Sequence, residues 1–240
     1  MTDIRALHKP VSRPDATTIA YGIGHAGAGA SVWNPVAESV GESVEIRALR
    51  LPARENRITT PAHPSVDQAA AEIARVVTDD AKEHGKPALV IGSCSGVLLA
   101  LAALDIMGDA PFVRASVFLR PPTEEQMGHT DAARVTSLDL PSLNEWLRKH
   151  QLTPAAVLDN DTMFKFFEPV VRADFAMVHG YRYRGRVLPY PTYVIPTADA
   201  WLTAATNVVR EDAGIAGDPL TEHPHELAGA ITEIAEALHD

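Results

Sequence analysis

The chain has 240 residues, with 21 Lys and Arg against 31 Asp and Glu, a net charge of −10 at pH 7 and one cysteine. This length suits one α/β domain with a large core, and we expect residues 1–240 to form it. The acidic balance offers no general attraction to nucleic acid or to an anionic membrane. A single cysteine cannot form an intrachain disulfide, and the sequence shows no apolar leader or membrane span, so we expect a soluble cytoplasmic protein.

Apolar runs typical of strands alternate with amphipathic helical patterns along most of the chain. We expect strands at 17–23, 44–49, 86–91, 113–119 and 191–195, and helices at 32–40, 65–77, 96–107 and 224–238. This alternation predicts an α/β fold in which helices cover both faces of a mostly parallel central sheet. Residues 123–167 interrupt it with three helical stretches, at 142–149, 154–158 and 162–167. We interpret them as a helical lid inserted into the domain.

The first strand opens into a glycine-rich loop, His25-Ala-Gly-Ala-Gly-Ala-Ser31. The loop lacks the Gly-Lys-Ser/Thr ending of a phosphate-binding loop and does not fit Gly-x-Gly-x-x-Gly, so a nucleotide site is disfavoured. We expect the backbone N–H of Ala26 or Gly27 to form part of an oxyanion hole. The alternative is an ordinary strand-to-helix turn.

The sequence Gly92-Ser93-Cys94-Ser95-Gly96 joins an apolar strand to an apolar helix. Glycines on both sides remove the Cβ atoms that would block a sharp reversal, which is the pattern of a nucleophile elbow. The helix N-terminus and its free N–H groups, that of Ser95 included, are expected to lower the pKa of the Cys94 thiol and to stabilise an oxyanion. We therefore predict that Cys94 is a nucleophile for acyl chemistry. An inert buried cysteine is the alternative.

Two later features also bear on function. Asp199 follows the strand at 191–195, where a sheet enzyme can place an acid that orients a catalytic base. The segment Tyr181-Arg-Tyr-Arg-Gly-Arg186 is the one basic cluster in the acidic chain. It suits either an acidic partner protein or phosphate, or else a solvated helix end.

Together these features resemble the stand-alone (type II) thioesterases of polyketide and nonribosomal peptide assembly lines, which have the α/β-hydrolase fold. The resemblance rests on the His25 loop, on Leu51-Pro-Ala-Arg-Glu55, on the elbow and, most specifically, on Pro169-Val-Val-Arg-Ala-Asp-Phe-Ala-Met-Val-His-Gly-Tyr-Arg-Tyr183. It implies hydrolysis of acyl or peptidyl groups from the phosphopantetheine arm of an acyl or peptidyl carrier protein. It also implies a Ser-His-Asp triad and no metal or organic cofactor.

The chain departs from this family pattern at two places. Cys94 stands where the family has serine, and the family's Gly-Gly-His-Phe-Phe turn falls near residues 217–220, where this chain has no histidine. The nearest histidines are His223, which we predict to be the base, and His225, which is the alternative. Asp199 resembles the family's acid.

We therefore predict an enzyme of natural-product biosynthesis that releases or transfers a carrier-bound acyl or peptidyl chain through a Cys94 acyl-enzyme. A Cys94 thioester stays an activated acyl donor, so an acyltransferase or cyclase with an amine, alcohol or carbanion acceptor is the first alternative. A catalytically degenerate protein that binds acyl groups or carrier proteins is the second. The expected partners are a carrier protein and a small-molecule acyl substrate, without nucleic acid, membrane, metal or cofactor.

Overall fold

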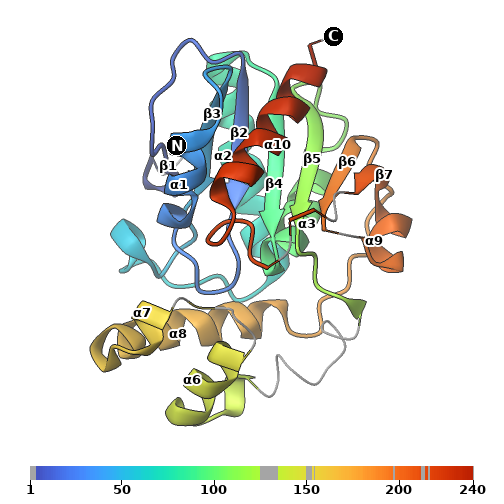
Figure 1. The fold of residues 1–240 in the computed structure, drawn as a ribbon. Coiled ribbons are helices and arrows are strands. Elements are labelled where there is room, and N and C mark those ends of the chain that lie inside the picture. The colour runs from blue at the N-terminus through green and yellow to red at the C-terminus, as the bar shows by residue number, and fades with distance from the viewer. Residues whose placement is uncertain are drawn as a thin grey trace.

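The computed structural model describes residues 4–124, 135–149, 153, 155–196, 198–211, 214–215 and 217–239. A seven-stranded sheet in the order β1-β3-β2-β4-β5-β6-β7 lies at the centre (Figure 1). Its strands are β1 Leu7–His8, β2 Thr18–Ile23, β3 Val44–Leu49, β4 Ala88–Ser93, β5 Val113–Leu119, β6 Pro191–Ile195 and β7 Asn207–Glu211. Of these strands, β1 pairs antiparallel with β3 and every other pair is parallel, which confirms the predicted mostly parallel sheet.

The five predicted strands correspond to β2 through β6, and the two outer strands were not predicted. The β7 strand lies at the sheet edge with most of its residues exposed, and β1 has two residues. Neither outer strand therefore carries a run of buried apolar residues, which is the signal that marks the inner strands.

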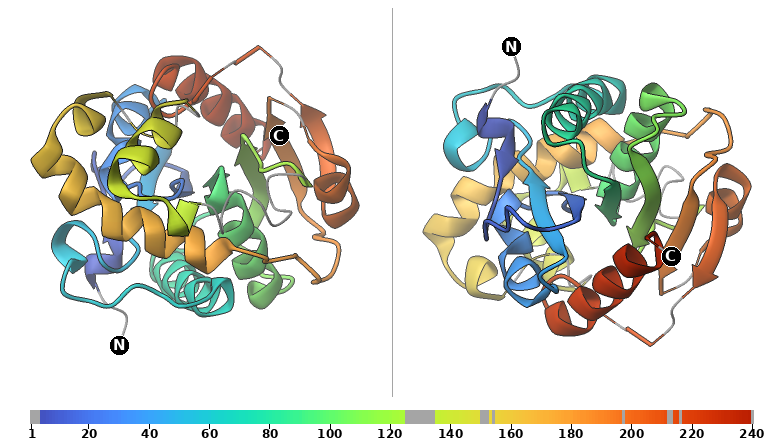
Figure 2. Two further views of the ribbon diagram at one scale, coloured as in Figure 1. Left: turned by 90° about the horizontal axis from the view of Figure 1, so that it is seen from below. Right: turned by 90° about the horizontal axis from the view of Figure 1, so that it is seen from above.

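Helices cover both faces of the sheet, as predicted (Figure 2). They are α1 Asn34–Ser39, α2 Val66–His84, α3 Ser95–Met107, α6 Leu140–Lys149, α7 Ala155–Leu158, α8 Asp161–Val178, α9 Ala200–Ala205 and α10 Pro224–Ala237, with 3-10 turns η1 Ile4–Ala6, η2 Ala30–Trp33 and η3 Glu55–Arg57. Side chains of α2 and α3 pack on one face, and those of α1 and α10 on the other. Across the described ranges, no helix combines the length and the apolar character that a membrane crossing requires.

Helices α6, α7 and α8 form a layer of their own beyond the edge at which the parallel strands end (Figure 1). They confirm the three helical stretches predicted between 123 and 167, although α8 continues to Val178, so the predicted lid boundary at 167 falls inside a helix. Residues 125–134, 150–152 and 154 of that segment lie outside the described residues. The layer has its own apolar cluster, formed by Val135, Leu143, Leu147, Leu158, Phe164 and Val171.

Two phenylalanines of α8 test whether this cluster stabilises the layer. Phe164 is 3% exposed and Phe166 is 73% exposed. We expect Phe164→Ala to lower the free energy of unfolding by about 3–5 kcal/mol, because it leaves a cavity. Phe166→Ala should change it by less than about 0.5 kcal/mol. Equilibrium urea denaturation of both variants measures the difference, and equal losses would contradict a separate core in the layer.

Candidate active site

Cys94 lies at the turn between β4 and α3, as the sequence predicted. Its backbone has φ 51° and ψ −119°, a conformation that residues other than glycine rarely adopt. The Cys94 N–H donates to the Leu119 carbonyl at 2.8 Å, and the Cys94 carbonyl accepts from the Val97 N–H at 3.0 Å. These bonds attach the elbow to the end of β5 and to the first turn of α3. They hold Cys94 at the carboxyl end of the parallel strands.

The glycines of the elbow are required by close backbone contacts. A Cβ on Gly92 would lie 2.7 Å from the Gly96 carbonyl oxygen, and a Cβ on Gly96 would lie 2.6 Å from the Gly24 carbonyl oxygen. Both distances are shorter than any ordinary contact, so no larger residue fits at either position. The same contact places Gly24, and the His25 loop that follows it, directly against the elbow.

Burial raises the pKa of the half-buried Cys94 thiol. The N–H of Ser95, which donates to the sulfur, and the positive charge of Arg120 act in the opposite direction, while the negative charge of Asp218 raises the pKa further. The expectation of a lowered pKa is therefore wrong. Desolvation of the thiolate outweighs the favourable groups at the helix N-terminus.

Two of the three backbone N–H groups that follow His25 are bound to other residues. The Gly27 N–H donates to Asp174 Oδ2 at 2.7 Å, and the Ala28 N–H donates to the His25 carbonyl at 3.0 Å. Among the described residues, the Ala26 N–H has no acceptor, although Ala26 is only 9% exposed. Of the two predicted donors, Ala26 is therefore the one whose N–H is available to an oxyanion, while the predicted role of Gly27 would require its bond to Asp174 to break.

The turn after β3 holds this loop in place from outside. Arg54 Nη1 donates to the Ala28 carbonyl at 2.8 Å, and Glu55 Oε1 accepts from the Ser31 N–H at 3.0 Å. The turn contains two residues other than glycine with positive φ, Ala53 at 65° and Glu55 at 48°. The family that the sequence resembles has glycine at the position of Ala53, which fits the left-handed backbone found there.

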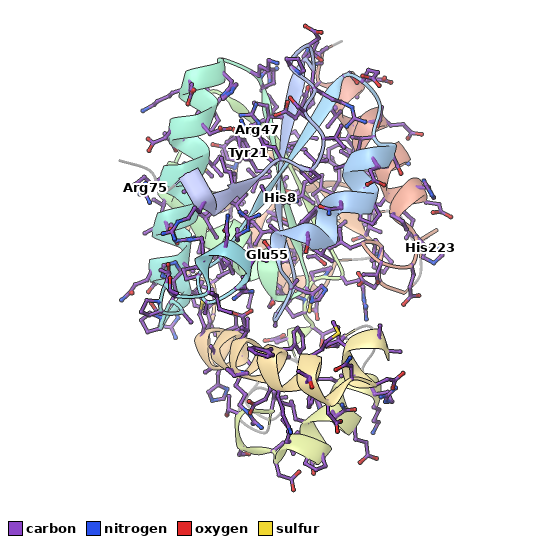
Figure 3. The ribbon with its side chains drawn as sticks, turned by 90° about the vertical axis from the view of Figure 1, so that its left-hand side faces the viewer. His8, Tyr21, Arg47, Glu55, Arg75 and His223 are labelled. Atoms are coloured by element: carbon purple, nitrogen blue, oxygen red, sulfur yellow. The ribbon has the colours of Figure 1, made fainter. Side chains whose placement is uncertain are left out.

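The predicted acid and base directly precede two different helices and interact with other groups. Asp199 precedes α9, and its Oδ2 accepts from the Glu124 N–H at 3.0 Å. His223 precedes α10, with its Nδ1 3.6 Å from Glu226 Oε1, and Figure 3 shows it at the outer edge of the molecule. The alternative base, His225, has its Nδ1 2.9 Å from Ser39 Oγ. None of these interactions connects the three residues to one another or to Cys94.

Two charged groups that act on Cys94, Arg120 and Asp218, were not predicted from the sequence. Asp218 is 8% exposed, accepts bonds from the Leu220 N–H and the Thr221 hydroxyl, and occupies the 217–220 segment where the family has histidine. Arg120 directly follows β5. The signal for Arg120 was its position at the carboxyl end of β5, the strand beside β4. The signal for Asp218 was its position in the segment where the family pattern has histidine. In the described part of the chain, His, Cys, Asp and Glu form no group of three or more that could hold a metal ion.

Residues 21–212 match the thioesterase domain family, which is well over half of the 240 residues. The chain therefore belongs to the thioesterase domain family. This membership supports a thioesterase role and a place among the hydrolases. Among curated proteins, no sequence matches the chain.

Several solved structures have the same fold. The type II thioesterase BorB from the borrelidin biosynthetic cluster matches with a TM-score of 0.82 and 20% identity, covering 98% of this chain and 99% of that one. The RedJ thioesterase from the prodiginine pathway in Streptomyces coelicolor matches with a TM-score of 0.75 and 20% identity, covering 92% of each chain. The type II thioesterase YbtT from the yersiniabactin NRPS/PKS pathway matches with a TM-score of 0.72 and 15% identity, covering 96% of this chain and 97% of that one. These likenesses confirm the predicted α/β-hydrolase fold.

Two substitutions should move the pKa of the Cys94 thiol in opposite directions. Asp218→Asn removes a negative charge that disfavours the thiolate, so the pKa should fall. Arg120→Gln removes a positive charge that favours it, so the pKa should rise. The rate of iodoacetamide alkylation against pH measures both shifts, because the thiolate is the reacting form. A wild-type midpoint below that of a small reference thiol would contradict the effect of burial.

A second pair of substitutions tests the backbone strain at Ala53. Ala53 has φ 65° and Gly85 has φ 64°, and a Cβ on Gly85 would meet no atom within 4 Å, so strain alone acts there. We expect Ala53→Gly to raise the free energy of unfolding by up to about 1 kcal/mol and Gly85→Ala to lower it by about 1 kcal/mol. Urea denaturation of both variants gives the two values. A loss of stability in Ala53→Gly would show that the alanine methyl group makes contacts that outweigh the strain.

Proposed function

We propose that the protein acts on acyl or peptidyl thioesters bound to carrier proteins in natural-product biosynthesis, through an acyl-enzyme on Cys94. The observation that carries this proposal is the position of Cys94 at the elbow, with the Ser95 N–H directed at its sulfur and the Ala26 N–H without an acceptor among the residues that the structure describes. Membership of the thioesterase domain family supports it. The matched structures from the borrelidin, prodiginine and yersiniabactin pathways support the class of substrate.

In the proposed first step, the Cys94 sulfur attacks the carbonyl carbon of the carrier-bound thioester. A bond forms between this sulfur and the acyl carbon, and the bond to the phosphopantetheine sulfur breaks. The proton of the Cys94 thiol ends on the departing phosphopantetheine thiol. The Ser95 and Ala26 N–H groups would stabilise the negative oxygen of the tetrahedral intermediate, which is the main contribution of such sites to the rate.

A thiol with a raised pKa needs a group that accepts its proton during the attack. The predicted acid and base, Asp199 and His223, could serve only after His223 leaves Glu226 and the preceding loop moves. The carboxylate of Asp218 already acts on the thiol. We therefore include Asp218 as a second proton acceptor, to be compared with His223 by substitution.

The fate of the acyl-enzyme separates two branches of this function. Hydrolysis needs an activated water molecule, whereas an amine, alcohol or carbanion can attack the Cys94 thioester with less help from a base. The present partners of His223 and His225 favour the transfer or cyclisation branch. They also motivate the competing proposal of a protein that binds acyl groups or carrier proteins without turnover.

Incubation with an acyl-phosphopantetheine thioester tests the function directly. Because Cys94 is the one cysteine of the chain, an acyl mass that intact-mass spectrometry finds on the wild type and not on Cys94→Ala can be assigned to it. We expect the wild type to gain the acyl mass, and Cys94→Ala to fall to near background, since loss of a nucleophile costs several orders of magnitude in rate. Cys94→Ser should be almost as inactive, because a hydroxyl depends more strongly on an adjacent base.

Further variants and acceptors distinguish the alternatives. His223→Ala should leave acylation unchanged if Asp218 accepts the proton. If His223 accepts it, Asp218→Ala should not slow acylation, because removing the Asp218 charge favours the thiolate. Product analysis with and without an amine acceptor separates hydrolysis from transfer. An acyl mass on Cys94→Ala, or a wild type that binds the thioester and never forms the adduct, would contradict the acyl-enzyme.

A further inference from the structure

The buried pair Arg54 and Asp174 connects three segments that lie far apart in the sequence. Arg54 is 6% exposed and Asp174 is 5% exposed. Arg54 Nη2 donates to Asp174 Oδ1 at 2.7 Å, and Arg54 Nη1 donates to Asp174 Oδ2 at 2.9 Å. This is a two-point bond between a guanidinium and a carboxylate, the geometry that fixes both side chains most strictly. It joins the turn after β3 to helix α8.

The same two side chains hold the backbone of the His25 loop. Asp174 Oδ2 accepts from the Gly27 N–H at 2.7 Å, and Arg54 Nη1 donates to the Ala28 carbonyl at 2.8 Å. Gly24, at the other end of the loop, rests on Gly96 of the elbow. The loop is therefore held at both ends, and Ala26, whose N–H has no acceptor in the described chain, lies between them.

Helix α8 packs on this loop with the face that carries Asp174. A Cβ on Gly27 would lie 2.6 Å from the Phe167 ring and 2.7 Å from a Val171 methyl group. Phe167, Val171 and Asp174 are spaced i, i+4 and i+7, so they share one side of the helix. The position of α8 and the position of the loop therefore depend on each other.

We propose that Arg54 and Asp174 are positioning residues that aim the Ala26 N–H at the oxyanion formed on the carbonyl that Cys94 attacks. The inference rests on the proposed acyl chemistry of Cys94. A buried ion pair is a poor source of stability, because apolar residues of similar size often stabilise a fold equally well. The geometry that the pair imposes on two backbone groups of the loop is what apolar residues could not replace.

Two variants test the inference. Asp174→Asn keeps the volume of the side chain and removes its charge, and the double variant Arg54→Met/Asp174→Leu replaces the whole pair with apolar residues. In both variants, we expect the rate constant for acylation of Cys94 to fall by about 10- to 100-fold, because a misdirected N–H donor stabilises the oxyanion of the transition state only weakly. The KM for the thioester should change little. Alkylation of Cys94 by iodoacetamide uses no oxyanion hole, so it should stay within about twofold of the wild type.

Asp80→Asn is the matched control. Asp80 is a second buried carboxylate, 9% exposed, and it accepts bonds from Arg47 and from the Tyr21 hydroxyl. Figure 3 shows Tyr21 and Arg47 well apart from helix α8. This substitution should lower the melting temperature and leave the acylation rate constant unchanged.

The possible results separate the inference from the function on which it rests. Acylation at the wild-type rate in either folded variant overturns the inference alone. A parallel fall in acylation and alkylation, or loss of folding in both variants, would show that the pair is a structural requirement, which also overturns it. A wild type that never acquires the acyl mass overturns the proposed function, and the inference with it.

Discussion

The contact of three backbone segments at the elbow is the constraint on which the rest of the structure depends. Strand β4, helix α3 and the start of the His25 loop approach so closely at Gly92 and Gly96 that no Cβ atom fits there. Cys94 is held between them at φ 51°, a conformation that costs about 1–3 kcal/mol. The buried strands β2, β4 and β5 offset this cost. Residues other than glycine that persist in such conformations cluster at functional sites.

Burial determines the electrostatics of the site more strongly than the helix N-terminus does. Removing the Cys94 thiolate from water disfavours it, and the nearby charges of Arg120 and Asp218 act in opposite directions on its pKa. Burial thus favours the thiol over the thiolate, and the chemistry of Cys94 depends on losing the proton during the attack. Sulfur suits this situation better than oxygen, because a thiol is far more acidic than a hydroxyl and needs less help from a base.

Two of the motifs that carry the family resemblance meet in space at one ion pair. Arg54 belongs to the Leu51–Glu55 turn, and Asp174 belongs to the 169–183 segment. The two side chains also bind the backbone of the His25 loop, which is the third motif. All three motifs therefore help to fix the backbone that lies against the elbow. The left-handed conformation of Ala53 is part of the same turn. The helical layer is joined to the sheet by this arrangement in addition to its covalent connections.

Local pattern was sufficient to predict the elbow, the inner strands, the helices on both faces and the helices of the layer over the sheet. Those features follow from the spacing of apolar residues and from glycines a few positions apart, which are properties of neighbouring residues. The edge strand β7, the raised pKa of Cys94, the bond that engages Gly27 and the contacts of Asp199 with Glu124 and of His223 with Glu226 were decided by the tertiary structure. Each depends on desolvation or on a contact between residues distant in the chain, such as Gly27 with Asp174. No local sequence pattern determines burial or long-range contacts, because both exist only once the sheet and its covering helices have assembled.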